Sequence, residues 1–463
     1  KLERAFNPKC VVVVGDKGES NYMWLRGQSE FKGKLYSVQV DPKEIEGIDA
    51  LGVQNFTSLM EIPEPVDLVI VAVPRPVAPR ILEDCIRKDV AAAHFFTSGF
   101  AETDTEDGIR LQAALTERAE ETNFHLIGPN CMGVYSPAFG IRQTPMQRTG
   151  FEGTVGFIAQ SGTHAITFSE EAYQQGVAVN KSVSFGNGIV LDSADYLEYF
   201  GSDDGIHAIG MYLEGVRDGR RFLKVLKEVA ARKPVVVWKG GRTEEGGRAI
   251  ASHTGSMAVP MAIWDAAIAQ CGGVKVRSME ELVDALKAIE NLASVYSDRV
   301  GIAGGSGGQS VAIADVFAEV GLKVPTLTQE SYDELDSFFT LIGGGYRNPI
   351  DTGNVNRREM KRIMEILERD ANVDNLVLLT SGNARLSGQM EGDIEMLVNI
   401  RQRSSKPVAV VLAFQSPEAV QESREVAQKL LEGGIPTFVS LDRGARALKN
   451  ALDYHKRRQA VGA

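Results

Sequence analysis

The stretch RAIASHTGSMA, residues 248–258, places His253 among Ala, Ser, Thr and Gly, which leave space around its imidazole ring. A neutral imidazole is a good nucleophile, and a carboxylate on its other ring nitrogen fixes the tautomer. Glu214, which directly follows the apolar run IGMYL, is a candidate for that carboxylate. No cysteine or second histidine stands at metal-ligand spacing from His253, so the pattern favours covalent chemistry over a metal site.

A turn that could accept a phosphate is predicted at AQSGTHA, residues 159–165. Ser161, Gly162 and Thr163 are small, and they separate an apolar run from the expected start of a helix. The N–H groups and the positive dipole end of such a helix suit an anion. In the alternative interpretation, Ser161 is only the N-cap of that helix. Together with His253 and Glu214, the turn predicts a phosphohistidine carrier rather than a hydrolase.

Other polar residues also follow apolar runs. Asn130, at the tip of LIGPNCMGVYSP, can offer a ligand both a donor and an acceptor. Its neighbour Cys131 is interpreted as a buried filler, because no activating histidine lies nearby in the sequence. For Glu214 the alternative is a solvent-exposed loop carboxylate, and His164 is the rival to His253 as the functional histidine.

Three copies of one strand–turn–helix unit would position these residues. Each copy has a short apolar run, typical of a buried parallel strand, followed by a Gly/Ser-rich turn. The pattern predicts an α/β protein of three Rossmann-like or flavodoxin-like domains with parallel sheets, with boundaries at 1–148, 149–295 and 296–463. The three units are CVVVVGDKGES (10–20), GTVGFIAQSGTHAITF (153–168) and DRVGIAGGSGGQSVAIAD (298–315).

Composition narrows the class of protein. A net charge of −11 over 463 residues argues against a nucleic-acid surface. The four cysteines form no CxxC pair, which indicates a reducing compartment, and no apolar run approaches the length of a membrane span. We therefore expect a cytoplasmic protein that binds neither nucleic acid nor a membrane.

The segments IGPNCMG, AQSGT, YLEGVRDGRRF and ASHTGS, in that order, resemble the α-subunit type of the ADP-forming acyl-CoA synthetases. These enzymes belong with the succinyl-CoA synthetases in one superfamily. DLVIVAVPRPVAPRILEDC, HFFTSGFAE and RNPIDTGN extend the resemblance over nearly the whole chain. It implies a CoA-binding domain, a ligase domain that carries a phosphohistidine loop, and a third ligase-like domain.

The resemblance implies that acyl-CoA and phosphate give acyl phosphate and CoA, and that the phosphoryl group passes to the histidine matching His253. Glu214 matches the stabilising glutamate of the family, and residues 161–163 match its phosphate-binding helix start. The remaining matches are CoA-binding positions at Gly15, Lys17, Gly18, Val73, Pro74, Ser98 and Gly99, and substrate-binding positions at Asn130, Gly186 and Asn187.

Three α/β domains use up the length, so the resemblance implies an ATP-grasp site for ADP, ATP and Mg²⁺ on a separate β subunit, in an α2β2 assembly. The identity of the acyl group is open, with acetate as the default among small carboxylic acids.

A noncatalytic CoA-sensing or scaffold subunit is one alternative function. A nicotinamide-dependent oxidoreductase, with Asp41 on the ribose, is another, although GxGxxG is lacking. Asp16 and Glu19 would repel CoA phosphates if they pointed inward.

Overall fold

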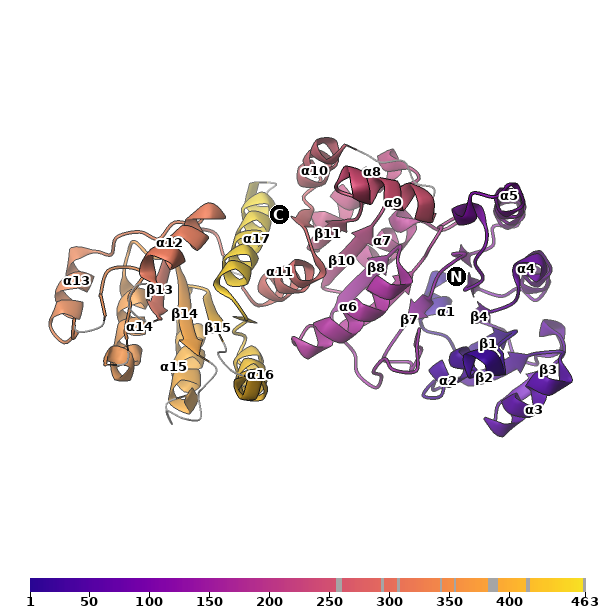
Figure 1. Cartoon of the computed structure of the whole chain (residues 1–463), viewed down its shortest axis with the longest axis horizontal. Helices are drawn as coiled ribbons and strands as arrows, with labels where there is room; N and C mark the ends of the chain where they lie inside the picture. The colour runs from indigo at the N-terminus through magenta and orange to yellow at the C-terminus, as the bar shows by residue number, and fades with distance from the viewer. Residues whose placement is uncertain are drawn as a thin grey trace. The chain divides into compact units, whose positions relative to one another are not determined.

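The computed structural model describes residues 1–254, 260–292, 295–305, 309–341, 344–353, 355–381, 390–413 and 417–460. These residues form an α/β fold with three sheets, whose strands are parallel except for one, as the continuous apolar runs predict. The sheets can be followed by colour in Figure 1, from indigo through magenta to orange. The chain divides into two compact units, residues 1–279 and 280–463.

The first sheet has the strand order β3-β2-β1-β4-β5-β6. This is the order of the Rossmann fold, in which ligands bind beyond the carboxyl ends of the strands. Its central strand is the predicted run of valines, and every residue of that strand is buried. The strands are β1 (Cys10–Val14), β2 (Lys34–Val38), β3 (Gln54–Phe56), β4 (Leu68–Val71), β5 (Ala92–Phe95) and β6 (Leu126–Ile127).

The second sheet has the order β12-β11-β10-β8-β9-β7. Its edge strand β7 runs antiparallel to β9 and comes from the N-terminal segment that otherwise builds the first sheet. One apolar core, with Val11 and Ile70 from the first sheet and Ile158 and Met211 from the second, joins the two sheets. The strands are β7 (Gly133–Tyr135), β8 (Val155–Ala159), β9 (Val179–Ser184), β10 (Ala208–Leu213), β11 (Val235–Lys239) and β12 (Val274–Val276).

Helices cover both sheets of this unit, and several begin where the sequence places a cap. Phe222, Val225, Leu226 and Val229 form the buried face of α8, as their spacing predicts. The helices are α1 (Leu2–Phe6), α2 (Met23–Gly27), α3 (Pro42–Ala50), α4 (Ala78–Arg87), α5 (Glu106–Glu121), α6 (Gly162–Gln174), α7 (Ser193–Ser202), α8 (Gly219–Ala230), α9 (Glu244–Thr254) and α10 (Met261–Gln270).

The C-terminal unit is built on the parallel sheet β13-β14-β15-β16. Its first helix, α11 (Met279–Asn291), belongs to this unit from Glu280 onward, whereas the expected boundary lies at 295/296. Asp284 of α11 is buried and accepts a hydrogen bond from Arg443 of α17 at 2.5 Å, which ties the helix to the end of the chain.

In the rest of the C-terminal unit, three α-helices lie between β13 and β14, and single helices lie between the later strands. None of the helices in the described part of the chain is long and apolar enough to cross a membrane. The elements are β13 (Val300–Gly304), α12 (Ser310–Glu319), α13 (Gln329–Asp336), α14 (Met360–Arg369), β14 (Asn375–Ser381), α15 (Met390–Arg403), β15 (Val408–Ala413), α16 (Pro417–Glu432), β16 (Thr437–Phe438) and α17 (Leu441–Ala460).

Candidate functional site

The predicted anion turn lies between β8 and α6. Ser161 has an extended backbone, and its hydroxyl oxygen accepts the backbone N–H of His164 at 3.3 Å, so it is the N-cap of α6. Thr163 is exposed in the first turn of the helix. At Gly162 a Cβ atom would lie 2.5 Å from the Cγ of Met132, so glycine lets the turn approach the segment that carries Asn130. The capping role of Ser161 is therefore present in the structure, and it uses only one of the N–H groups of the first turn.

Glu214 is 6% exposed and directly follows β10, so its interpretation as a solvent-exposed loop carboxylate is wrong. Its Oε1 accepts a hydrogen bond from the Tyr212 hydroxyl at 3.2 Å. Its backbone N–H donates to Oε1 of Gln160, which also accepts the N–H of Gly215 at 2.9 Å. Because β8 and β10 are neighbours, Gln160 at the end of β8 fixes the chain where Glu214 leaves β10.

A buried lysine holds the same chain segment from the other side. Lys239, at the end of β11 and 4% exposed, donates from Nζ to the backbone carbonyl of Glu214 at 2.7 Å and to that of Gly240 at 2.5 Å. Burial lowers the pKa of Lys239, while the charge of Glu214 opposes this shift. The carboxyl ends of β8, β10 and β11 are thus linked by side-chain contacts around Glu214.

The two candidate histidines occupy different elements. His253 lies in the last turn of α9, where we expected a loop, and its side chain is outside the described part of the structure. His164 lies in the first turn of α6, with its ring centroid 4.3 Å from that of Tyr212 and 4.8 Å from that of Trp238. Burial lowers the pKa of His164, and the Glu214 carboxylate partly opposes this effect. His164 is therefore a packed aromatic neighbour of the Glu214 segment.

The predicted substrate residues meet between the two sheets of the N-terminal unit. Asn130 adopts a left-handed backbone with φ of 58°, and its Nδ2 donates to Oδ1 of Asn187 at 3.4 Å. Asn187 in turn donates to Glu102 at 2.7 Å and to Gln112 at 2.9 Å. At Gly186 a Cβ atom would lie 2.1 Å from the Asn130 carbonyl oxygen, so only glycine fits. Asn130 and Asn187 are therefore joined by a hydrogen bond, and the backbone of Gly186 lies against that of Asn130.

Cys131, beside Asn130, is 3% exposed, and burial raises the pKa of its thiol to about 12. A thiol in this environment stays protonated and poorly nucleophilic at neutral pH. The interpretation of Cys131 as a buried filler is therefore confirmed.

The predicted CoA-binding residues lie at the carboxyl ends of β1, β4 and β5, which are neighbours in the first sheet. Gly15 has φ of 83°, and a Cβ atom there would lie 2.6 Å from Cγ1 of Val73. The Thr97 hydroxyl donates to the Val73 carbonyl at 2.7 Å, which joins this loop to the one carrying Ser98 and Gly99. The remaining members, Lys17, Gly18 and Pro74, are exposed.

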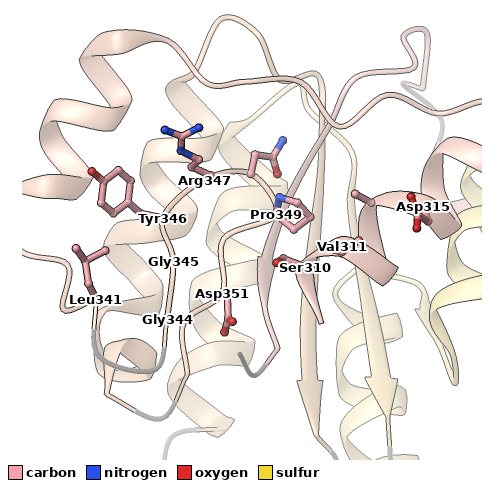
Figure 2. A pocket seen from close by; sticks show the side chains of 12 residues that line it. Ser310, Val311, Asp315, Leu341, Gly344, Gly345, Tyr346, Arg347, Pro349 and Asp351 are labelled. Carbon is pink, nitrogen blue, oxygen red and sulfur yellow. The ribbon is translucent and has the colours of Figure 1, made fainter. Parts of the chain in front are cut away.

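The C-terminal unit contains a pocket of about 840 Å³ between α12 and the loop before α14. Figure 2 shows Ser310 and Asp315 on α12, and Tyr346 and Arg347 on the loop at the other side of the pocket. Arg347 is outnumbered by acidic side chains in this lining, which does not favour a phosphate. None of the site residues predicted from the sequence lines it; the remaining lining residues are Val311, Ala314, Leu341, Gly344, Gly345, Asn348, Pro349 and Asp351.

Sequence reasoning missed Gln160, Lys239 and Glu102. Gln160 and Lys239 each end an apolar strand run, and a polar residue at that place is the signal that could have found them. Glu102 follows no such run, and only the fold brings it to Asn187.

Comparison with known proteins identifies the class of protein to which the two N-terminal domains belong. Residues 9–137 match the family described as a CoA binding domain, and residues 152–289 match the succinyl-CoA ligase like flavodoxin domain. A CoA-binding domain followed by a succinyl-CoA ligase-like domain defines the class of acyl-CoA synthetases related to succinyl-CoA ligase.

Relatives that match nearly the whole of this chain identify the family more closely. The α subunit of acetate–CoA ligase (ADP-forming) I from Pyrococcus furiosus is 32% identical, with 98% of each chain covered. Acetate–CoA ligase (ADP-forming) I from Archaeoglobus fulgidus is 34% identical and covers 98% of this chain, which spans 64% of that longer protein. A dinucleotide-forming acetyl-coenzyme A synthetase 1 from Candidatus Korarchaeum cryptofilum, solved with phosphate and ADP, is 28% identical. The two structures superpose with a TM-score of 0.83, and the match covers 100% of this chain and 98% of the synthetase chain. The chain belongs to the ADP-forming acetate–CoA ligase family, in which it corresponds to the α subunit.

Proposed function

We propose that this chain is the α subunit of an ADP-forming acyl-CoA synthetase, which interconverts acyl-CoA, ADP and phosphate with a carboxylic acid, CoA and ATP. The observation that supports this most directly is the contact between Gln160 and the backbone of Glu214. It joins the predicted anion turn, which starts at Ser161, to a buried carboxylate on the neighbouring strand. Phosphohistidine chemistry needs both parts at one sheet edge.

In the proposed reaction, the turn at residues 161–163 holds phosphate while an oxygen of the phosphate attacks the thioester carbonyl. The C–S bond breaks, and CoA leaves as a thiolate that takes up a proton. Asn130, Gly186 and Asn187 orient the acyl group. A ring nitrogen of His253 then attacks phosphorus, and the carboxylate leaves.

Glu214 is the proposed partner of the imidazole. A carboxylate that accepts the N–H of one ring nitrogen leaves the other nitrogen as the nucleophile, and it stabilises the cationic ring of the phosphohistidine. The backbone contacts from Gln160 and Lys239 keep this carboxylate in place without using its oxygens.

CoA is the proposed ligand of the first sheet. The positions assigned to it are Gly15, Lys17, Gly18, Val73, Pro74, Ser98 and Gly99, and their common place at one sheet edge supports the assignment. We assign the CoA-binding domain to 1–148, the phosphohistidine ligase domain to 149–295 and the third ligase-like domain to 296–463.

ADP, ATP and Mg²⁺ are assigned to an ATP-grasp β subunit in an α2β2 assembly in the cytoplasm. Within the described residues, no group of three His, Cys, Asp or Glu side chains could hold a metal ion. The Pyrococcus furiosus relative is named as an α subunit, which supports a partner chain.

The test uses only sites assigned to this chain. The purified protein is incubated with phosphate, Mg²⁺ and a panel of acyl-CoAs, and the acid-labile phosphoryl adduct is located by intact mass and peptide mapping. We expect the adduct on His253, with loss in His253→Ala and retention in His207→Ala, a matched change at an exposed histidine. If no adduct forms even with acetyl phosphate and the partner subunit present, the proposal fails, and a noncatalytic CoA-sensing or scaffold role is favoured.

A further inference from the structure

A carboxylate of the protein itself occupies the first glycine turn. Oε2 of Glu44, on helix α3, accepts the backbone N–H of Gly18 at 2.7 Å. The same oxygen accepts the Tyr22 hydroxyl at 3.0 Å. Gly18 is exposed and Glu44 is half-buried, so a ligand at this turn would meet the carboxylate directly.

The backbone around this contact is shaped to hold it. Tyr22 adopts the left-handed conformation with φ of 48°, which is unusual for a bulky residue. At Gly47 of α3, a Cβ atom would lie 1.9 Å from the Tyr22 hydroxyl oxygen, so the glycine makes room for the ring. Gly18, Tyr22, Glu44 and Gly47 therefore form a fitted arrangement, which we name the Glu44 clamp.

The other acid of the turn has a different role. Asp16 is 1% exposed, and its carboxylate accepts the backbone N–H of Leu25 at 2.8 Å and that of Lys17 at 3.0 Å. Asp16 thus holds the start of the turn and α2 together, and its charge is directed to N–H groups of its own loop. Glu44 is the carboxylate that lies on the exposed N–H of Gly18.

We infer that Glu44 is an internal competitor for the CoA phosphates and determines how tightly the turn binds CoA. The inference rests on the proposed function, because it takes residues 15–18 as part of the CoA site. A carboxylate and a phosphate are both acceptors, and one N–H group cannot serve both well. Their like charges also repel at short range. CoA can therefore bind in two ways: Glu44 moves away from Gly18, or the CoA phosphate binds beside the carboxylate and its affinity is lowered by the repulsion.

The test is calorimetric titration of the purified chain with CoA. Glu44→Gln keeps an oxygen that can accept from Gly18 and Tyr22, and it removes only the charge. We expect Glu44→Gln to bind CoA about five- to tenfold more tightly at low salt, and the gain to shrink as salt screens the charge. Glu46→Gln, the same change on the exposed side of α3, should alter the affinity less than about twofold.

Glu44→Ala and 3′-dephospho-CoA sharpen the result. Tighter CoA binding in both Glu44 variants supports competition. Weaker CoA binding in Glu44→Ala with no change in Glu44→Gln would show that Glu44 only organises the turn, and this result would overturn the inference. A gain with both ligands places the competition at the diphosphate, and a gain with CoA alone places it at the 3′-phosphate. If the unaltered chain binds CoA and Glu44→Gln binds it equally, only the inference fails. If neither binds CoA, the proposed CoA site fails as well.

Discussion

The side-chain oxygen of Gln160 accepts the backbone N–H of Glu214, and through it the end of β8 is bonded to the first residue beyond β10. The same oxygen accepts the N–H of Gly215 at 2.9 Å. Gln160 and Ser161 are consecutive, so the residue that precedes the predicted anion turn is bonded directly to the backbone of Glu214.

Replacing Gln160 with Met should separate these two parts. Two buried N–H groups would lose their acceptor, which costs about 1–3 kcal/mol of unfolding free energy for each unsatisfied group. The carboxylate would also be displaced, so we expect phosphorylation of His253 to slow at least tenfold. Denaturant unfolding and the rate of adduct formation measure the two effects. Gln270→Met, at the exposed end of α10, is the control and should leave both unchanged.

Replacing Glu214 with Gln should leave the fold nearly intact, because the amide oxygen can still accept from Tyr212. The substitution would remove the charge that we propose stabilises the cationic imidazole ring of His253. We expect the rate of phosphoadduct formation to fall about 10²-fold, with the affinity for CoA unchanged. Stopped reactions followed by intact mass give the rate. Glu198→Gln, an exposed acid on α7, provides the comparison, and an equal loss there would contradict the specific role.

Acid should destabilise the N-terminal unit through His94. Its ring is fully buried and makes no hydrogen bond within the described residues, and burial lowers its pKa to about 3. As pH falls below the ordinary pKa near 6.5, the unfolded chain takes up a proton that the folded chain refuses, so stability falls until about pH 3.

A variant isolates this contribution. Between pH 7 and pH 5, His94 alone should cost about 2 kcal/mol of unfolding free energy. His94→Phe keeps an aromatic ring against Trp24 and removes the titration, so its pH dependence should be shallower by that amount. Urea unfolding at the two pH values measures the difference, and parallel curves for the two proteins would contradict the assignment.

Gly186→Ala should disrupt the cluster of Asn130 and Asn187. The added Cβ meets the Asn130 carbonyl oxygen at 2.1 Å, and φ of 50° is itself unfavourable for alanine. Gly150→Ala has φ of 82° with nothing within 4 Å of the new Cβ, so it carries only the backbone strain of about 1–2 kcal/mol. We expect Gly186→Ala to be the more destabilised in thermal unfolding, and equal losses would show that the contact relaxes freely.

Strand positions and the turns after them could be predicted from the sequence, because buried parallel strands are continuous apolar runs. Glu214 could be placed at a strand end for the same reason. The contact between Gln160 and the backbone of Glu214 could not be predicted, because no sequence pattern indicates that β8 and β10 are neighbours in the sheet. For α11, the apolar spacing of Leu282, Leu286 and Ile289 predicted a helix but not the unit against which it packs.

The edge strand β7 has a consequence for the way this chain can be divided. Residues 133–135 precede the domain boundary proposed at 148/149, yet they pair with β9 of the following sheet. A recombinant fragment that begins at residue 149 would leave β9 with an unpaired backbone edge, which favours self-association. The fragment 1–148 would carry β7 without its partner strand. The proposed CoA-binding and ligase domains therefore share one strand. A fragment boundary that gives folded pieces has to keep β7 with the ligase domain, or the two domains have to be expressed together.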